Sequence, residues 1–209
     1  TNATVRCKTL LIASGTRMKK LHVVGEKEFL RNGVDYGSNP DLDIYKGKEI
    51  VIIGSTQIAA QEALLVAPYA KKVTLVFRND TLIVPTSVQN KIESVSNIDL
   101  IPTSEIEQIQ GEDSVEKILV KNVSTNNIKN VPAEEIIISI GISPNTDYLD
   151  KSINLDEKRF VITSPTYMTN QDGVFAAGSI RSQGHRAIMP GFSDGFLAAQ
   201  SITSYLESI

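Results

Sequence analysis

The sequence contains one cysteine, no excess of positive charge and no long apolar run, and each shortage narrows what the protein can do. Cys7 alone cannot form an intrachain disulfide, which fits a reducing compartment. A net charge of -3 leaves no basic stripe to displace the counterions of a nucleic acid. No apolar run reaches the roughly 18 residues that a transmembrane helix needs. We therefore expect a cytoplasmic protein without a nucleic-acid or membrane partner.

Metal ligands and a leader segment are also missing from the sequence. His22 and His185 have no cysteine or acidic cluster at ligand spacing, so no metal site is predicted. The first residues are polar, which indicates no signal peptide. The chain begins at Thr1, and the strand expected at residues 8–13 has no neighbour before it. We therefore expect a fragment of a longer protein, a separate domain, or a chain whose N-terminal part was removed.

What the sequence does contain is an alternation of strand and helix patterns. Runs of β-branched residues predict buried strands, and alanine- and leucine-rich stretches predict helices. Such alternation is typical of an α/β protein with Rossmann-like parallel sheets and helices on both faces. Ligands of such sheets bind at the carboxyl ends of the strands. Strands are predicted at residues 8–13, 49–54, 72–77, 115–123, 135–140 and 173–177, and helices at 26–31, 57–70, 90–96 and 194–205.

The strand–helix–strand unit at residues 49–77 contains a glycine turn of the dinucleotide-binding type. Gly54 ends the first strand and would make the tight turn, and Ala59 is small enough for close helix–strand packing. Thr56 stands where a middle glycine would let the backbone approach a pyrophosphate at the helix N-terminus. If the turn requires a positive φ, Thr56 costs about 1–2 kcal/mol.

The residue that follows the second strand of this unit selects the cofactor. An acidic residue there would bind a ribose 2′-hydroxyl, whereas Arg78 favours a 2′-phosphate. The alternative is a unit that only packs, with Arg78 as a solvated charge. Asp80 and the carboxylates at Glu105, Glu107 and Glu112 are most simply interpreted as a solvated face.

Several short motifs lie in the order and spacing of one enzyme family. They are Leu11–Gly15, Gly33–Tyr36, Gly47–Gly54, Ile140–Thr146 and Gly173–Gly178. From Lys8 to the C-terminus, the chain therefore resembles the thioredoxin reductases, a family of flavin-dependent disulfide reductases, with few gaps.

The resemblance implies two domains and two cofactors. In the family, FAD binds one domain, and NADPH binds a second domain inserted into it. On this chain the partial FAD-type domain would be residues 1–35 and 142–209, and the inserted NAD(P)-type domain residues 36–141. The family's first glycine-rich FAD motif would lie upstream of Thr1, so FAD binding would need that missing half. The resemblance also implies a homodimer.

The chain departs from the family at the redox-active cysteine pair. Residues 36–41 align without a gap to the family's Y-C-x-x-C-D, which places Gly37 and Pro40 at the two cysteine positions. Disulfide exchange needs a thiolate and a resolving thiol, and neither residue has sulfur. We therefore predict no catalytic residue at this place, and we expect Cys7 to be inert.

The family's NADPH-binding arginines are also depleted. Its H-R-R-x-x-x-R motif corresponds to residues 77–83, where only Arg78 remains. Each lost charge-assisted contact is worth about 1.5–3 kcal/mol. Two losses weaken binding by roughly 10²- to 10⁴-fold. NADPH binding is therefore expected to be weak at most.

On the flavin side, the resemblance implies a set of residues around the FAD. Ser179 replaces the family's ribityl-binding acid, and Ala187 replaces a glutamine beside the flavin ring. Asp194 and Gly195 match the family at the start of the last predicted helix, whose N-terminus would face the flavin. The implied FAD-binding residues are Gly15, Gly178, Ser179, Arg186, Ala187, Asp194 and Gly195.

Two functions remain open from the sequence. The first is a thioredoxin-reductase-like FAD/NAD(P) oxidoreductase with an altered electron donor and acceptor. The second is a non-catalytic binding or regulatory protein on the same scaffold. The redox partner, whether protein or small molecule, is not identified by either hypothesis.

Overall fold

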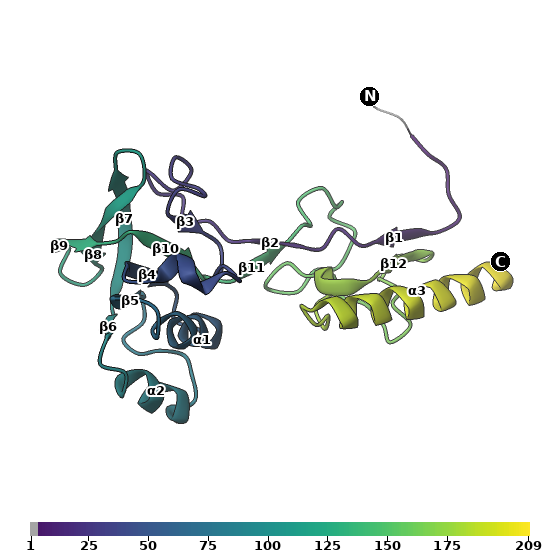
Figure 1. The fold of residues 1–209 in the computed structure, drawn as a ribbon. Helices are drawn as coiled ribbons and strands as arrows, with labels where there is room; N and C mark the ends of the chain where they lie inside the picture. Colours follow the sequence, from purple (N-terminus) through teal and green to yellow (C-terminus); the bar gives the residue numbers. More distant parts are fainter. Residues whose placement is uncertain (1–3) are drawn as a thin grey trace. The chain divides into compact units, whose positions relative to one another are not determined.

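The computed structural model describes residues 4–209 and divides the chain into two compact units (Figure 1). The central unit is Lys19–Gly141, and the terminal unit joins the residues up to Met18 to Ile142–Ile209. The central unit contains β3 (Val34–Asp35), η1 (Leu42–Tyr45), β4 (Glu49–Ile53), α1 (Gln57–Val66), β5 (Lys72–Val76), α2 (Thr86–Glu93), β6 (Ile98–Ile101), β7 (Ser104–Gly111), β8 (Val115–Asn122), β9 (Ile128–Pro132) and β10 (Glu135–Ile138). The terminal unit contains β1 (Leu10–Ile12), β2 (Thr16–Met18), β11 (Ile142–Pro144), β12 (Val174–Ala176), η2 (Gly178–Ile180) and α3 (Ile188–Ser208).

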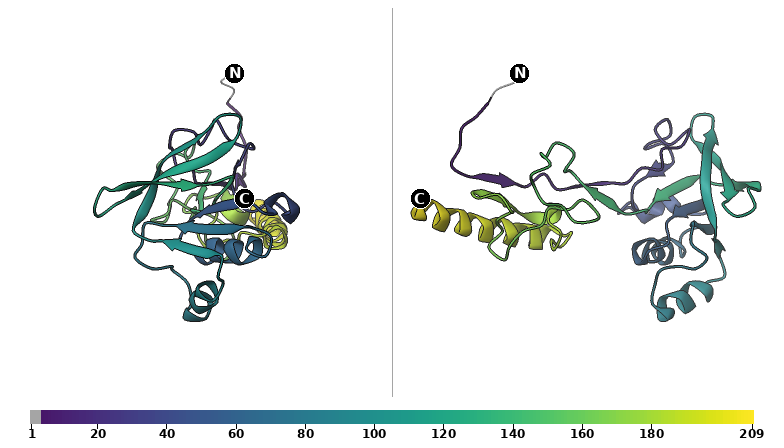
Figure 2. Two further views of the ribbon diagram at one scale, coloured as in Figure 1. Left: turned by 60° about the vertical axis from the view of Figure 1, so that its left-hand side comes forward. Right: turned by 180° about the vertical axis from the view of Figure 1, so that it is seen from behind.

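The central unit is built on a five-stranded parallel sheet in the order β3-β10-β4-β5-β6. Figure 2 shows the ribbon from two further sides. Along β4, side chains alternate between the faces of the sheet. Ile50 and Ile52 pack with α1 and α2, whereas Val51 and Ile53 pack with residues of β7, β8 and β9. Because both faces are covered, β4 can be apolar along nearly its whole length.

The predicted α/β class with parallel sheets is confirmed, but the covering of the central sheet differs from the expectation. Helices cover one face, and the antiparallel sheet β7-β8-β9 covers the other. Ile106, Ile118 and Val131 supply the apolar side of that second layer. Helix and antiparallel sheet serve equally here, because each presents one apolar face to bury.

Residues 19–35 belong to the central unit and not, as the resemblance implies, to the FAD-type domain. Phe29 and Val34 are buried in the core cluster that contains Ile109. The amide of Ile109 donates to the carbonyl of Val24 at 2.9 Å. The boundary therefore lies after Met18, because the apolar contacts of this segment are made with β7 and β10.

Two predicted helices differ from those observed. Residues 26–31 form turns rather than a helix, and Gly25 has φ +88 with the backbone of Ile109 against it. The last helix, α3, begins at Ile188, six residues before the predicted start, which was residue 194. Its central residue Ala198 is buried, and Tyr205 packs edge-on against Phe175 with ring centroids 5.9 Å apart.

A buried carboxylate holds the turn segment of the central unit in place. Glu26 is 5% exposed and accepts hydrogen bonds from the amides of Leu21 (2.9 Å) and His22 (2.7 Å) and from the hydroxyl of Tyr36 (2.7 Å). Burial raises the pKa of Glu26, but these hydrogen bonds lower it further than burial raises it, so the net shift is downward. Burial, together with the hydrogen bond to the Glu26 carboxylate and its charge, raises the pKa of Tyr36 to about 12.

We predict that Glu26→Gln lowers the free energy of unfolding at pH 7 by about 1–3 kcal/mol, because a buried charge-assisted site is lost. Because the pKa of Glu26 is lower in the folded than in the unfolded state, its carboxylate stabilises the fold at pH values above the unfolded pKa. This stabilisation is lost as the pH falls through the folded pKa. In denaturant titrations, the free energy of unfolding should therefore fall more between pH 7 and pH 4 in the wild type than in Glu26→Gln. Glu28→Gln, exposed on the same turn segment, is the matched control. An equal fall in the free energy of unfolding in the wild type and in Glu26→Gln would contradict the stabilising role of the Glu26 carboxylate.

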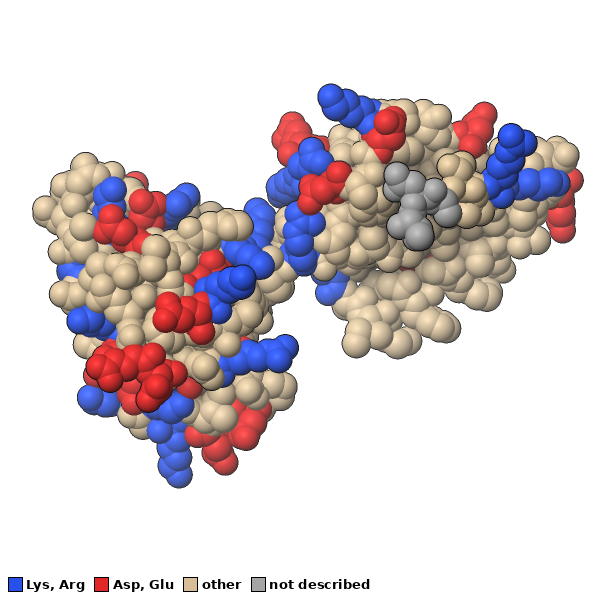
Figure 3. Space-filling view, turned by 90° about the horizontal axis from the view of Figure 1, so that it is seen from above, with Lys and Arg blue, Asp and Glu red and all other residues tan. Residues whose placement is uncertain are grey.

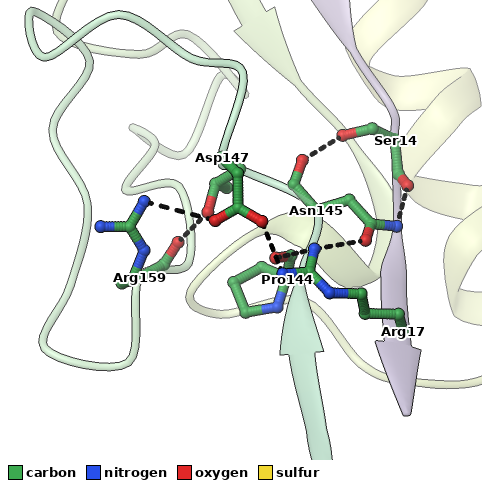
Figure 4. A network of polar contacts seen from close by, with 7 residues as sticks. Ser14, Arg17, Pro144, Asn145, Asp147 and Arg159 are labelled. Atoms are coloured by element: carbon green, nitrogen blue, oxygen red, sulfur yellow. Dashed lines mark hydrogen bonds and ion pairs between the residues drawn. The ribbon is translucent and has the colours of Figure 1, made fainter. Parts of the chain in front are cut away.

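The terminal unit combines a parallel pair, β1-β12, with an antiparallel pair, β2-β11. A polar network ties the chain after β1 to the chain after β11 (Figure 4). The Asn145 amide group donates to the Ser14 carbonyl (2.8 Å), and the Ser14 hydroxyl donates to the Asn145 carbonyl (3.0 Å). Arg17 donates to the Asn145 side chain at 2.9 Å. Asn145 lies in the motif Ile140–Thr146, and it fixes the segment around Gly15, whose carbonyl accepts from the backbone amide of Asn145 at 3.0 Å.

Candidate functional site

The central unit has a cavity of about 570 Å³ at the carboxyl ends of β4 and β5. This is the position at which a parallel α/β sheet binds ligands. Three residues of the predicted NAD(P) site lie on its wall, namely Gly54, Thr56 and Arg78. Ser55, Asn79, Ser104, Glu105 and Lys20 add polar groups to the lining.

The turn at Gly54 can be made only by glycine. Its φ is +149, and a Cβ at this position would lie 2.3 Å from the carbonyl oxygen of Ser139 and 3.1 Å from the Cβ of Ala59. The Gly54 amide donates to the carbonyl of Val76 at 3.0 Å, which ties the turn to β5. Gly54 and Ala59 therefore bring α1 close to the sheet, as the sequence pattern predicts.

Thr56 is not strained, so the conditional cost assigned to it does not arise. Its φ is -88 and its ψ is 169, an extended conformation that a β-branched residue adopts readily, at the N-cap of α1. The amide of Ile83 donates to the carbonyl of Ser55 at 2.7 Å, and Thr56 and Ile83 form a β-bridge. The segment after β5 therefore lies beside the glycine turn, and the Thr56 side chain is exposed at the cavity.

Arg78 is engaged with a carboxylate on the same cavity wall. Its Nη2 lies 2.8 Å from Oε2 of Glu105, a residue that the sequence analysis interpreted as part of a solvated face. Glu105 is the second residue of β7, and the amide of Ser104 beside it donates to the carbonyl of Phe77 at 2.9 Å. That backbone contact brings the start of β7 next to the end of β5. No local sequence signal marks this pairing.

Gly37 and Pro40, for which the resemblance implies an alignment with a cysteine pair, lie in a polar segment near α1. Gly37 has φ +89, and a Cβ there would lie 3.4 Å from Oε1 of Glu62. The same oxygen accepts from the amide of Ser38 at 3.3 Å. Neither Gly37 nor Pro40 lines the cavity of the central unit or the cavity of the terminal unit that is described next. Cys7 is exposed and lies in the terminal unit.

The terminal unit has its own cavity of about 470 Å³, and the structure gathers most of the predicted FAD residues around it. Gly178 has φ +78 with nothing within 4 Å of the position of a Cβ, so its backbone is open. A Cβ at Gly15 would lie 3.7 Å from the Ser179 hydroxyl, so Gly15 and Ser179 lie close together on the cavity wall. The lining includes Gly15, Gly178, Ser179, Arg186, Ala187 and Gly195.

Asp194 is not on the wall of this cavity but supports it from behind. Because α3 begins at Ile188, Asp194 lies in the second turn of the helix and not at its start, which corrects the predicted position. Its Oδ2 accepts from the amide of Gly178 (3.0 Å) and from Nη1 of Arg181 (2.8 Å). The Arg181 side chain is only 8% exposed, and its guanidinium lies 4.2 Å from the centre of the Tyr167 ring.

Arg181 is thus a residue that sequence reasoning missed, since its role depends on partners distant in the chain. Arg186 is different, because it is exposed at the cavity. Its guanidinium lies 4.4 Å from the centre of the Phe160 ring and donates to the carbonyl of Gly184 at 2.8 Å. These contacts orient the guanidinium and leave further donors for an anionic ligand.

The surface drawn in Figure 3 carries lysine and arginine side chains interspersed with acidic ones. It therefore offers no single-sign stripe on that face. Among residues 4–209, no three or more histidine, cysteine or acidic residues gather as a metal site would require. In the described part of the chain, no helix combines the length and apolar character needed to span a bilayer.

The chain is similar in sequence to a family of known proteins. The family model described as pyridine nucleotide-disulphide oxidoreductase matches residues 1–195. Thioredoxin reductase of Peptoclostridium acidaminophilum is 32% identical over 99% of this chain and 67% of its own length. Thioredoxin reductase of Dictyostelium discoideum is 31% identical over 98% of this chain and 65% of its own length. The chain thus spans about two thirds of the length of these relatives.

Solved structures give the same result. The crystal structure of Lactococcus lactis thioredoxin reductase superposes with a TM-score of 0.82 at 29% identity, over 96% of this chain and 67% of that one. The structure of T. acidophilum thioredoxin reductase gives a TM-score of 0.79 at 29% identity, over 99% of this chain and 68% of that one.

Proposed function

Because the chain belongs to the pyridine nucleotide-disulphide oxidoreductase family, we propose that it is the nucleotide-binding part of a thioredoxin-reductase-like oxidoreductase. In this proposal the central unit binds a nicotinamide dinucleotide, and the terminal unit forms one side of an FAD site. The observation that carries the proposal is the glycine turn at Gly54, which opens into a cavity at the carboxyl ends of β4 and β5.

Three features of the cavity in the central unit support the proposal that it binds the diphosphate of a dinucleotide. The N-terminus of α1 is at Thr56, on the cavity wall, and an α-helix N-terminus presents backbone amides to an anion. The exposed hydroxyl of Thr56 and the half-buried hydroxyl of Ser55 add neutral polar groups. No acidic residue lies in the first turn of α1, so nothing there repels a phosphate.

The cavity of the terminal unit fits part of an FAD. The open backbone at Gly178 permits a close approach, Ser179 offers a hydroxyl, and Arg186 offers an oriented cation. The remaining contacts would come from a segment corresponding to the part of the relatives that this chain does not match. When bound, FAD supplies hydride and electron transfer. A homodimer and a cytoplasmic location are carried over from the family as part of the proposal.

The proposed oxidoreductase does not use a cysteine pair at residues 37–40. Gly37 and Pro40 offer no sulfur there, and Cys7 is the one cysteine of the sequence. The electron acceptor is therefore proposed to differ from a disulfide relayed through that pair. A non-catalytic nucleotide-binding protein on the same scaffold is the second candidate, favoured by the same two residues. Electron transfer from NADH or NADPH to a dye, measured with FAD bound and with the segment that would complete the FAD site present, would distinguish the oxidoreductase from this second candidate.

We expect Thr56→Glu to weaken binding of NAD⁺ by about 10- to 100-fold, because a carboxylate at the helix N-terminus competes with the pyrophosphate for the same donors. Isothermal titration calorimetry of the full chain measures this loss. Thr56→Gln is the matched control, since it has nearly the same size without the charge. Equal losses in both variants, or no measurable binding to the wild type, would contradict a dinucleotide site at this turn.

A further inference from the structure

The ion pair between Arg78 and Glu105 lies where the adenosine ribose of a dinucleotide would be recognised. Arg78 follows β5, the second strand of the strand–helix–strand unit, and such a position reads the ribose 2′ substituent. Both side chains line the β4–β5 cavity together with Gly54 and Thr56. Their side chains are 77% and 31% exposed, respectively, so the carboxylate is the more enclosed partner on the cavity wall.

The carboxylate changes what the arginine can recognise. A 2′-phosphate that approaches Arg78 must come close to the like charge of Glu105, 2.8 Å from the guanidinium. Asp80 adds a second carboxylate to the same segment, held by the hydroxyl of Thr103 at 3.0 Å. A ribose 2′-hydroxyl faces the opposite situation, because it can donate a hydrogen bond to a carboxylate oxygen.

Lys20 is the other cation on the cavity wall. It belongs to the segment before the Glu26 turn, whereas Arg78 and Glu105 lie at the ends of β5 and β7. The arginine that follows β5 is thus paired with a carboxylate at 2.8 Å and is not a free cation.

We propose that Glu105 is a specificity-determining residue that makes the cavity select dinucleotides with a free 2′-hydroxyl over those with a 2′-phosphate. The inference rests on the proposed function, namely that this cavity binds a nicotinamide dinucleotide. Glu105 acts in two ways: it occupies Arg78, and it offers an acceptor to the ribose hydroxyl.

The test is a calorimetric titration of the full chain with NAD⁺ and with NADP⁺, which differ only in the 2′-phosphate. The wild type is expected to bind NAD⁺ at least about tenfold more tightly than NADP⁺, the effect of one charge-assisted contact. Glu105→Gln keeps the size of the side chain and releases Arg78, so it should shift the NAD⁺/NADP⁺ affinity ratio at least about tenfold toward NADP⁺.

Two further variants separate local from general effects. The double variant Glu105→Gln/Arg78→Gln should lose the gain in NADP⁺ affinity, because the released arginine is gone. Glu107→Gln removes the same charge from the same strand at an exposed position and should leave the ratio unchanged. Wild-type preference for NADP⁺, or an unchanged ratio in Glu105→Gln, overturns the inference and leaves the proposed function standing. If neither dinucleotide binds any variant, the proposed nicotinamide site is overturned, and this inference with it.

Discussion

Replacing Gly54 by alanine is expected to lower the free energy of unfolding of the central unit by about 3–5 kcal/mol, at the upper end of single-residue effects. A Cβ at this residue would lie 2.3 Å from the carbonyl oxygen of Ser139, a backbone atom that cannot move without shifting the segment after β10. The φ of +149 adds conformational strain in the variant, since residues with a side chain rarely adopt this backbone conformation. Urea denaturation followed by circular dichroism measures the loss.

The matched control for this variant is Gly47→Ala. Gly47 also has a positive φ, +72, but nothing lies within 4 Å of the position of a Cβ. Gly47→Ala should therefore lower the free energy of unfolding only by the local backbone strain, about 1–2 kcal/mol. If the two variants were equally destabilised, the close approach of the Ser139 carbonyl to Gly54 would not be the reason for its glycine. NAD⁺ binding should also be lost at Gly54 and retained at Gly47, because only the former turn lines the cavity.

The second large effect is expected at Asp194 in the terminal unit. Asp194→Ala should lower the free energy of unfolding by about 3–5 kcal/mol, because it leaves the Arg181 guanidinium buried without its counter-charge. The variant also removes the acceptor of the Gly178 amide, 3.0 Å away, and so loosens the wall of the cavity. Denaturant titration followed by hydrogen exchange of the backbone amides of the terminal unit, that of Gly178 included, measures the effect.

Two controls distinguish this buried pair from ordinary surface charges. Asp147 pairs with Arg17 and Arg159 but is 64% exposed, so Asp147→Ala should cost less than about 1 kcal/mol. Replacing both buried partners, in Arg181→Met/Asp194→Leu, should recover much of the loss, since no charge is then left unpaired. A loss at Asp194 no larger than that at Asp147 would show that the buried pair does not hold this wall.

Much of the fold follows from local patterns. The β-branched run at residues 49–53 and the alanine-rich stretch after Gly54 specify a strand, a tight turn and a helix, whatever surrounds them. The structure confirms the α/β class, and Gly54 has the geometry that the pattern requires. The helix predicted at residues 26–31 was wrong because the Glu26 carboxylate and the backbone of Ile109 hold that segment in turns.

Local patterns identify the site residues by type and position but do not predict their contacts. Thr56 was identified from its spacing, but its unstrained φ depends on how the turn meets α1. Asp194 was identified from a motif, yet its partners are Arg181 and the Gly178 amide behind the cavity. The charge of Arg78 was visible in the sequence, whereas its pairing with Glu105 was not.

The sequence by itself determined the fold class, the glycine turn and the lack of sulfur at residues 37 and 40, because each depends on residue type and short spacing. Only the tertiary structure decided that residues 19–35 join the central unit, that an antiparallel sheet covers its second face, and that Glu105 neutralises Arg78. Those features depend on which strand ends meet in space. Strand pairing between distant segments is fixed by the burial of the whole core, and a single chain carries no local signal for it.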